Sequence, residues 1–350
     1  VAFAVKYLGA QQVDQPHTGG DGRCALIKWC TFLNTAPPGG IDYQFHFVKG
    51  YHRPNGTMTI DEFENRMFAL HGDLGQPGAA YDQYMDFHVT LATDNLDAIV
   101  APMLADGYAL LARQAPGQNP SVFVEMPHAL ILEITGPGLT VITPSPWSRC
   151  GSPARPARIN HQAARALAAE QRAAGVKPVS TVRPLRAVYA SSVPKEAAEY
   201  VAWAFGGEIV SPASFLPGAG NGTCYEAHVV RWSSAASTYE LMWIHSPKQA
   251  QGAFPLSQYE SYLHDLHGNI SSNIYDEYMD NHVALVMSTA DDQTRRLDDA
   301  GEQYFLRGQY GMGCDVFIQG PGGQIYETLN KLQLRIKNPA KWDLCGPLLD

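Results

Sequence analysis

Short apolar runs and amphipathic stretches alternate along the chain, and near its end they follow a fixed order. Residues 282–287 form an apolar run typical of a buried strand, and 290–300 have the spacing of an amphipathic helix that stops at a glycine. Three more strands are predicted over 303–307, 315–319 and 324–329, with a Pro-Gly-Gly turn before the last. The predicted order is strand, helix, strand, strand, strand.

The same order is predicted at two earlier places in the chain. One set of elements lies over 88–92, 96–105, 108–111, 122–125 and 129–134. In the other set, the pattern predicts the order with one strand fewer, over 185–192, 194–205, 224–232 and 237–244. Strands and helices are thus interleaved in repeated short units, which indicates an α+β fold.

The chain also repeats itself directly in sequence. The segment Tyr81-Asp-Gln-Tyr-Met-Asp-Phe-His-Val89 recurs as Tyr275-Asp-Glu-Tyr-Met-Asp-Asn-His-Val283, and other ordered matches flank both copies. A tandem duplication follows, with a first domain over 1–150 and a second over 185–350. Residues 151–184, rich in Pro, Ala, Arg and Gly, are predicted to be a linker that carries one short helix.

The first copy begins at a segment that matches the helix of the second copy. We therefore expect the opening strand of the first copy to lie upstream of residue 1, or to be supplied by another chain. Removal of upstream residues is the simpler of these two explanations.

The closing hairpin Phe317-Ile-Gln-Gly-Pro-Gly-Gly-Gln-Ile-Tyr-Glu327, with a His-Val at the opening strand of each later unit, resembles the vicinal oxygen chelate superfamily. That superfamily includes glyoxalase I, extradiol dioxygenases and bleomycin-binding proteins. The resemblance implies four βαβββ modules, paired two and two into glyoxalase-like domains. It also implies a metal site in a cup between two facing modules.

The ligand sets that the resemblance implies differ between the copies. They are Glu240, His282 and Glu327 in the second copy, and Gln44, His88 and Glu133 in the first. The fourth slot of the second copy falls at Ala187, which cannot bind a metal. These sets would suit one divalent ion such as Zn, Fe, Mn or Ni. The alternative is that the same residues are inherited scaffold and hold no metal.

Charge and composition narrow the choice of partners. The net charge of −9 argues against a nucleic-acid-binding surface. The chain contains no run of 18 apolar residues, so the sequence predicts no membrane span. The sequons at Asn55, Asn221 and Asn269 and the even number of cysteines favour a secreted glycoprotein. Disulfides would involve Cys24, Cys150, Cys224 and Cys345, although six reduced thiols in a cytosolic protein would fit the same count.

Two functions remain open from the sequence. The first is a secreted, non-catalytic glycoprotein of glyoxalase-like fold, whose partner is a small-molecule ligand or another copy of itself. The second is a metal-dependent lyase, isomerase or ring-cleaving dioxygenase that uses the second-copy site. The absent ligand at Ala187 favours the first.

Overall fold

The computed structural model describes thirteen stretches of the 350-residue chain. These stretches are 2–13, 24–28, 44–48, 88–114, 117–126, 131–146, 158–175, 182–210, 227–233, 238–245, 283–287, 290–309 and 313–330. Two segments whose sequence pattern predicts further helices, near 60–70 and 256–266, lie outside these stretches. In the described part of the chain, no helix is both long enough and apolar enough to cross a bilayer.

The unit at 88–135 forms one half of a large sheet. Its elements are β4 (His88–Ala92), α4 (Leu96–Ala105), β5 (Leu110–Gln114), β6 (Ser121–Glu125) and β7 (Ile131–Thr135). Strand β4 pairs in parallel with β7, and β7, β6 and β5 follow as antiparallel neighbours. The first and last strands of the unit are therefore adjacent.

The unit at 183–245 repeats this topology. Its elements are β11 (Arg183–Ser191), α6 (Pro194–Phe205), β12 (Glu208–Val210), β13 (Ala227–Ser233) and β14 (Thr238–His245). Strand β11 pairs in parallel with β14, and β13 and β12 continue outward as antiparallel neighbours. The opening and closing strands again lie side by side.

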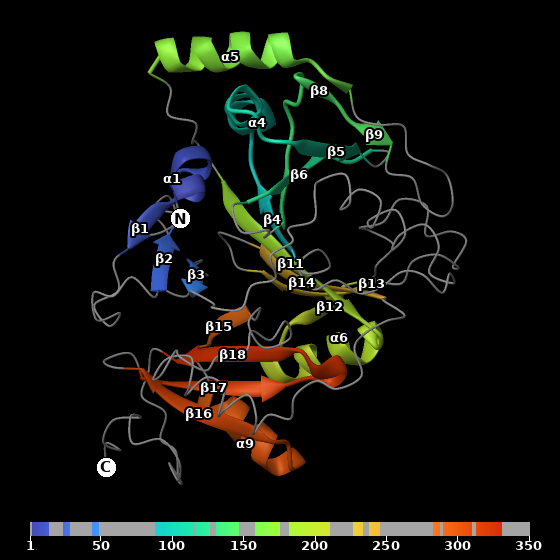
Figure 1. The fold of residues 1–350 in the computed structure, drawn as a ribbon. Helices are drawn as coiled ribbons and strands as arrows, with labels where there is room; N and C mark the ends of the chain where they lie inside the picture. The colour runs from blue at the N-terminus through green and yellow to red at the C-terminus, as the bar shows by residue number, and fades with distance from the viewer. Residues whose placement is uncertain are drawn as a thin grey trace, which may run out of the picture.

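An antiparallel pair between β4 and β11 joins the two units edge to edge. The result is a nine-stranded sheet in the order β12-β13-β14-β11-β4-β7-β6-β5-β9, where β9 is Ser145–Pro146. Figure 1 shows β4 and β11 at the middle of the molecule, where the upper and lower parts of the sheet meet. The sheet therefore contains strands from before and from after the linker predicted at 151–184.

A third unit has its own four-stranded sheet. Its elements are β15 (Val283–Met287), α9 (Ala290–Ala300), β16 (Tyr304–Gln309), β17 (Gly313–Gln319), the short 3₁₀ turn η5 (Pro321–Gly323) and β18 (Ile325–Asn330). The sheet order is β15-β18-β17-β16, with β15 parallel to β18. The predicted α+β class is confirmed.

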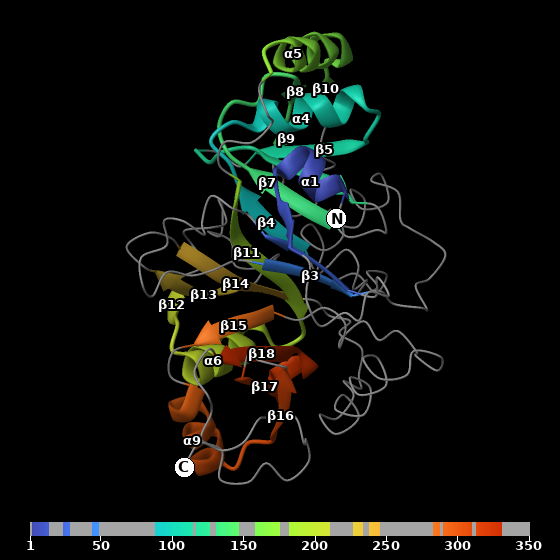
Figure 2. The same cartoon turned by 90° about the vertical axis from the view of Figure 1, so that its left-hand side faces the viewer.

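The remaining elements lie around these sheets. A three-stranded sheet contains β1 (Gln11–Val13), β2 (Cys24–Lys28) and β3 (Gln44–Val48), and a two-stranded one pairs β8 (Ile142–Thr143) with β10 (Arg158–Ile159). Helices α1 (Ala2–Leu8) and α5 (His161–Ala173) both pack on α4. In the view of Figure 2, α5 lies across the top of the molecule above α4.

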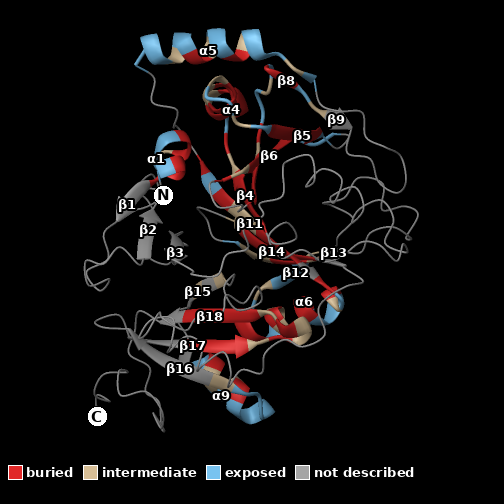
Figure 3. Cartoon of the chain, in the orientation of Figure 1, coloured by how far each residue is buried: buried red, intermediate tan, exposed pale blue. Residues whose placement is uncertain are grey.

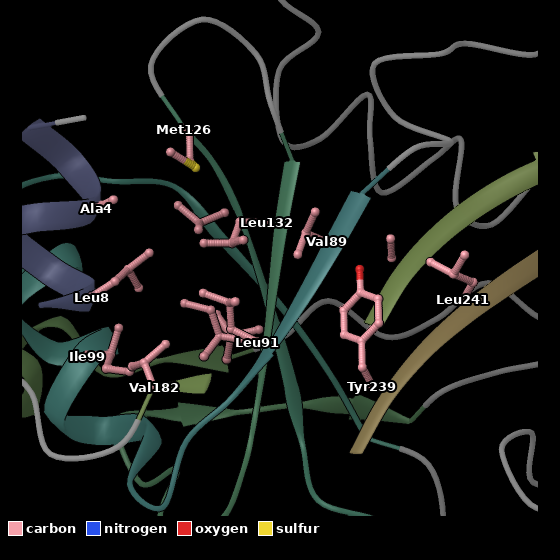
Figure 4. Packing of buried hydrophobic residues seen from close by; sticks show 14 of the residues in the cluster. Ala4, Leu8, Val89, Leu91, Ile99, Met126, Leu132, Val182, Tyr239 and Leu241 are labelled. Atoms are coloured by element: carbon pink, nitrogen blue, oxygen red, sulfur yellow. The ribbon is translucent and has the colours of Figure 1, made fainter. Parts of the chain in front are cut away.

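One face of the nine-stranded sheet is apolar along a row of paired positions. The register places Val230, Leu241, Ala187, Val89, Leu132 and Val124 opposite one another on adjacent strands. All six are buried. Figure 4 shows Val89 beside Leu132 in this core, and the same cluster includes Ile99 of α4 and Leu8 of α1. This face is the one that the helices cover.

Local side-chain bonds position α4 on the sheet. The Asn95 side chain accepts a hydrogen bond from the Ala98 amide and caps the helix. Asp97, in the first turn, accepts bonds from the amides of Thr140 and Val141, so the loop after β7 is tied to the helix. A glycine is required at position 136, directly after β7, since a Cβ there would lie 2.1 Å from the Thr93 carbonyl oxygen.

Helix α5, predicted as the single helix of the linker, lies mostly on the surface. It buries only Ala164 and Ala168, and Figure 3 shows the rest of its length as exposed or intermediate. Two small residues four positions apart allow close approach to α4 on one side. The linker helix is therefore a cover on α4 with a narrow apolar stripe.

Aromatic side chains join the second and third units. Trp243 of β14 donates its indole N–H to the Tyr326 hydroxyl of β18 at 3.0 Å, and both side chains are fully buried. Tyr189 and Phe205 pack against the Tyr326 ring. Helix α6 also contacts α9, so the two units share one core.

A row of charges across the central sheet

The face of the sheet opposite the apolar row carries charged and polar side chains. The register aligns Arg231, Glu240, Arg186, Thr90 and Glu133 on β13, β14, β11, β4 and β7. Directly opposed residues on neighbouring strands point to the same face. We call these five residues the polar row.

Glu240 lies between two arginines in this row. Its Oε1 accepts hydrogen bonds from Nε and Nη2 of Arg231 at 2.9 and 2.8 Å, and its Oε2 lies 3.3 Å from Nη2 of Arg186. The Glu240 side chain is 3% exposed, against 19% for Arg186 and 30% for Arg231. Burial of a carboxylate is tolerated only with such partners.

Glu133 is the second carboxylate of the row and lies at its end on β7. It accepts the hydroxyl of Thr90, and its Oε2 lies 3.7 Å from Nε2 of His88, two residues earlier on β4. His88 is itself buried, and its ring packs edge-on against Phe123. His88 and Glu133 are therefore brought together, as the resemblance implied for the first copy.

The ionisation of Glu133 reflects these neighbours. Burial by itself raises the pKa of this carboxyl group, but His88, Arg186 and the Ser121 side chain together lower the pKa from 4.5 to about 2. Glu133 is therefore a carboxylate at neutral pH. The row then holds two carboxylates and two guanidinium groups, so its charges balance.

The sequence placed Ala187 at the fourth ligand slot. In the structure, the residue of β11 that lies on the same face as Glu240 and Glu133 is Arg186. Ala187 pairs with Leu241 and Val89 and belongs to the apolar row, whereas Arg186 pairs with Glu240 and Thr90. The ligand sets implied from the sequence did not include Arg186, Arg231 or Thr90. An available signal was the charged residue inside the apolar strand Leu185-Arg186-Ala187-Val188.

The implied ligands group differently in space. Glu240 of the second copy lies in one sheet with His88 and Glu133 of the first copy. Glu327 is buried on β18, where it pairs with Ala284 of β15 and Phe317 of β17. The structure does not place Glu240 and Glu327 in the same sheet.

Several predicted residues are not tested. His282 lies outside the described residues, next to the first residue of β15, and Gln44 is described only as the first backbone position of β3. Of the four cysteines predicted to form disulfides and the three sequons, only Cys24 falls in a described strand, β2, and a fifth cysteine, Cys314, lies in β17. The positions outside are Cys150, Cys224, Cys345, Asn55, Asn221 and Asn269. The disulfides and glycans stay predictions.

The polar row does not fit a divalent metal ion. Within the described ranges, no three His, Cys, Asp or Glu side chains are grouped closely enough to hold one. Both oxygens of Glu240 face guanidinium groups, so a metal would have to displace Arg231 to reach Oε1 or Arg186 to reach Oε2. The positive charges beside Glu240 are supplied by the guanidinium groups of Arg186 and Arg231.

Comparisons with known proteins return similar folds and no sequence relatives. No family model and no curated protein matches the chain. Maize (Zea mays) glyoxalase I is similar at 10% identity and a TM-score of 0.48, over 94% of this chain and 86% of the enzyme. A dioxygenase-like protein of Bacillus subtilis is similar at 13% identity and a TM-score of 0.47, over 95% and 80% of the two chains.

A third structure, lactoylglutathione lyase from Agrobacterium tumefaciens, shares 16% identity with this chain. The similarity extends over 44% of this chain and 96% of the lyase, at a TM-score of 0.25. These neighbours belong to the vicinal oxygen chelate superfamily, the superfamily named from the sequence. Such low identities and TM-scores carry no information on activity.

We expect the stability of the protein to fall in acid through Glu133. The folded-state pKa, near 2, is below the ordinary value of 4.5, so the stabilisation is complete above pH 4.5 and is lost as the pH falls toward 2. The shift corresponds to about 3 kcal/mol at neutral pH. Urea unfolding of wild type and Glu133→Gln at several pH values checks this.

The difference in unfolding free energy between the two proteins should be largest at pH 5–7 and should shrink below pH 4.5. Glu199→Gln, at an exposed position of α6, is the control and should show no such convergence. A difference for Glu133→Gln that stays constant down to pH 3 would contradict the role given to the carboxylate.

Proposed function

We propose that this chain is a non-catalytic protein of glyoxalase-like fold, with a role in ligand binding or assembly. The observation that carries the proposal is the engagement of Glu240 by Arg231 and Arg186. In a metal-dependent enzyme of this kind the carboxylate would bind the ion and leave open positions for substrate. Here the carboxylate is already neutralised by side chains.

A second candidate function is metal-dependent catalysis near Glu327. On β18, Glu327 pairs with residue 284, two positions after His282. On β7, Glu133 pairs with Thr90, two positions after His88, so the register is the same. The two pairs differ at one point, because residue 284 is an alanine and has no hydroxyl to donate.

If it binds a metal, the third unit would use His282 and Glu327, with further ligands from other parts of the chain. The ion would be one of Zn, Fe, Mn or Ni, and it would act as a Lewis acid toward a small molecule with adjacent oxygens. The reaction would be that of a lyase, an isomerase or a ring-cleaving dioxygenase.

Metal analysis of the purified chain separates the two candidates. We expect less than about 0.1 equivalents of Zn, Fe, Mn or Ni per chain, and the same value for His88→Ala and His282→Ala. These two variants are matched, because each removes the histidine before an equivalent strand pair. One metal per chain, lost in His282→Ala and kept in His88→Ala, would establish the catalytic candidate instead.

Secretion and glycosylation belong to the same proposal. They are supported by the sequons at Asn55, Asn221 and Asn269 and by the cysteine count. Mass spectrometry of the chain expressed through a secretory pathway, before and after glycosidase treatment and reduction, tests them. An unchanged mass after both treatments would exclude modification at these residues.

A further inference from the structure

Helix α5 and the residues beside it form a positively charged segment in an otherwise acidic chain. Residues 149–186 contain eight Lys and Arg residues and one acidic residue, Glu170, which gives a net charge of +7. The whole chain carries −9, so the residues outside this segment carry −16. Separation of charge on this scale produces a field that attracts a partner of opposite charge.

The cations of α5 lie along one side of the helix. His161, Arg165 and Arg172 are all exposed. Because successive residues are about 100° apart around a helix, the spacings of four and seven residues place the three side chains within an arc of about 40°. Glu170 lies on the opposite side. We call His161, Arg165 and Arg172 the basic stripe.

Helix α9 carries the opposite charge at the other end of the molecule. The exposed acidic residues of α9 and of the segment that follows it are Asp292, Asp298, Asp299 and Glu302. Of the two arginines of this helix, Arg296 is held against α6 by a hydrogen bond to the Ala204 carbonyl, and Arg295 pairs with Asp292. Figures 1 and 2 both show α5 at the top of the molecule and α9 at the bottom.

At one end of each helix these charges oppose the stability of the helix. The last turn of α9 contains Asp298 and no basic residue, and the first turn of α5 contains His161 and no acidic residue. A carboxylate is unfavourable at the negative C-terminal end of a helix, as a cation is at the positive N-terminal end. Their placement therefore indicates a role other than helix formation.

The charges on the two helices have the same spacing. Arg165 and Arg172 are seven residues apart on α5, and Asp292 and Asp299 are seven residues apart on α9. At about 1.5 Å per residue, each pair spans about 10.5 Å along one side of its helix. Two such helices side by side therefore match two guanidinium groups with two carboxylates, a combination that forms strong hydrogen bonds.

We propose that the basic stripe of one copy of this chain binds the acidic surface of α9 on a second copy, head to tail. The two surfaces differ and lie at opposite ends of the molecule, so the contact is heterologous. Repetition of the contact gives an open row of copies or a closed ring. This contact rests on the assembly role in the proposed function and names its partner.

A second copy fits the basic stripe better than a lipid surface or a nucleic acid. None of the large apolar side chains that are exposed in the described ranges lies on α5, whereas helices that bind in a lipid interface insert such side chains. The −16 carried by the rest of the chain would repel a long polyanion. A second copy places that acidic remainder against the basic segment.

The test is sedimentation velocity of the full chain over a range of protein concentrations. We expect wild type to self-associate, with an apparent Kd at least about tenfold higher in about 0.5 M salt than in about 0.05 M salt, because salt screens exposed charges. Arg165→Gln combined with Arg172→Gln, and Asp292→Asn combined with Asp299→Asn, should each weaken the association at least about tenfold. All four positions are exposed, so the variants should fold, which circular dichroism checks.

A mixture of the two double variants distinguishes head-to-tail binding from a symmetric contact. The arginine variant keeps α9 intact and the aspartate variant keeps α5 intact, so one molecule of each should form a dimer that does not grow. A symmetric contact between two α5 helices would instead leave the aspartate variant self-associating. Lys195→Gln combined with Glu199→Gln, an exposed ion pair of α6, is the matched control and should associate as wild type does.

A wild-type chain that stays monomeric at about 1 mM in low salt would overturn the inference. Binding of polyglutamate or of phosphatidylserine vesicles through Arg165 and Arg172, by a chain that does not self-associate, would also overturn it, since the partner would be a different anion. Failure of the proposed function has a separate signature. Metal in wild type that depends on His282 would overturn the non-catalytic function, whereas absence of self-association would overturn only the contact between copies.

Discussion

Replacement of Trp243 by alanine is expected to destabilise the protein by about 3–5 kcal/mol, the range for a large aromatic side chain removed from a core. The indole is fully buried on β14, stacks with Tyr189 and bonds to the Tyr326 hydroxyl. Its loss would open a cavity between the second and third units. Urea denaturation, with hydrogen exchange of β14 and β18, measures the effect.

Two further variants define the cause. Tyr326→Phe keeps the ring and removes only the acceptor of the indole N–H, so it should cost about 1–3 kcal/mol. Trp203→Ala, on the exposed side of α6, removes the same residue type from the surface and should cost about 1 kcal/mol or less. Equal losses for Trp243→Ala and Trp203→Ala would show that Trp243 does not hold the two units together.

Removal of Glu240 is expected to have an effect of similar size for an electrostatic reason. Glu240→Ala leaves Arg186 and Arg231 side by side without their shared carboxylate, and loss of one partner of a buried ion pair costs about 3–5 kcal/mol. Glu240→Gln keeps an oxygen acceptor for Arg231 and should lose less. The measurement is equilibrium unfolding in urea at neutral pH.

The matched control is Glu199→Ala in the same unit. Its carboxylate lies 3.8 Å from Lys195 on α6, and both side chains are more than half exposed. Solvent screens such a pair, and the change should stay within about 0.5 kcal/mol. If Glu240→Ala were as mild as Glu199→Ala, the two arginines would have to be satisfied by other groups.

The sequence predicted the local elements well where the signal was short-ranged. The helices over 96–105, 194–205 and 290–300 and the strand over 88–92 agree residue for residue with α4, α6, α9 and β4. The signals for α6 all lie within one short stretch of sequence: apolar spacing, Pro194 at the helix start and Gly206 directly after its end. In the structure Gly206 has a φ of 73°, a conformation that favours glycine.

The site was harder to predict because it depends on register between distant strands. A shift of one residue moves every side chain of a strand to the opposite face. Arg186 and Ala187 are neighbours, and only the pairing of β11 with β14 and β4 decides which of them lies beside Glu240. A register shift between Pro184 and Arg186 adds to the difficulty.

The choice of partner strands was the other missing fact. The sequence suggested that a ligand set would be completed within each copy of the repeat. The structure instead hydrogen-bonds β4, before the linker, to β11, after it. Neither apolar periodicity nor the repeat indicates which open strand edges will meet, since both strands have the same pattern in isolation.

The bond between β4 and β11 also bears on how the chain reaches its native state. The two strands lie about ninety residues apart, so their pairing is a contact of long sequence separation and closes a large loop at an entropic cost. Until that loop closes, each strand presents an open edge that could bind another molecule of the same protein. When synthesis has reached residue 175, the strands from β4 to β9 are complete but β11 is not yet made. The edge of β4 therefore stays unpaired until the later residues are synthesised.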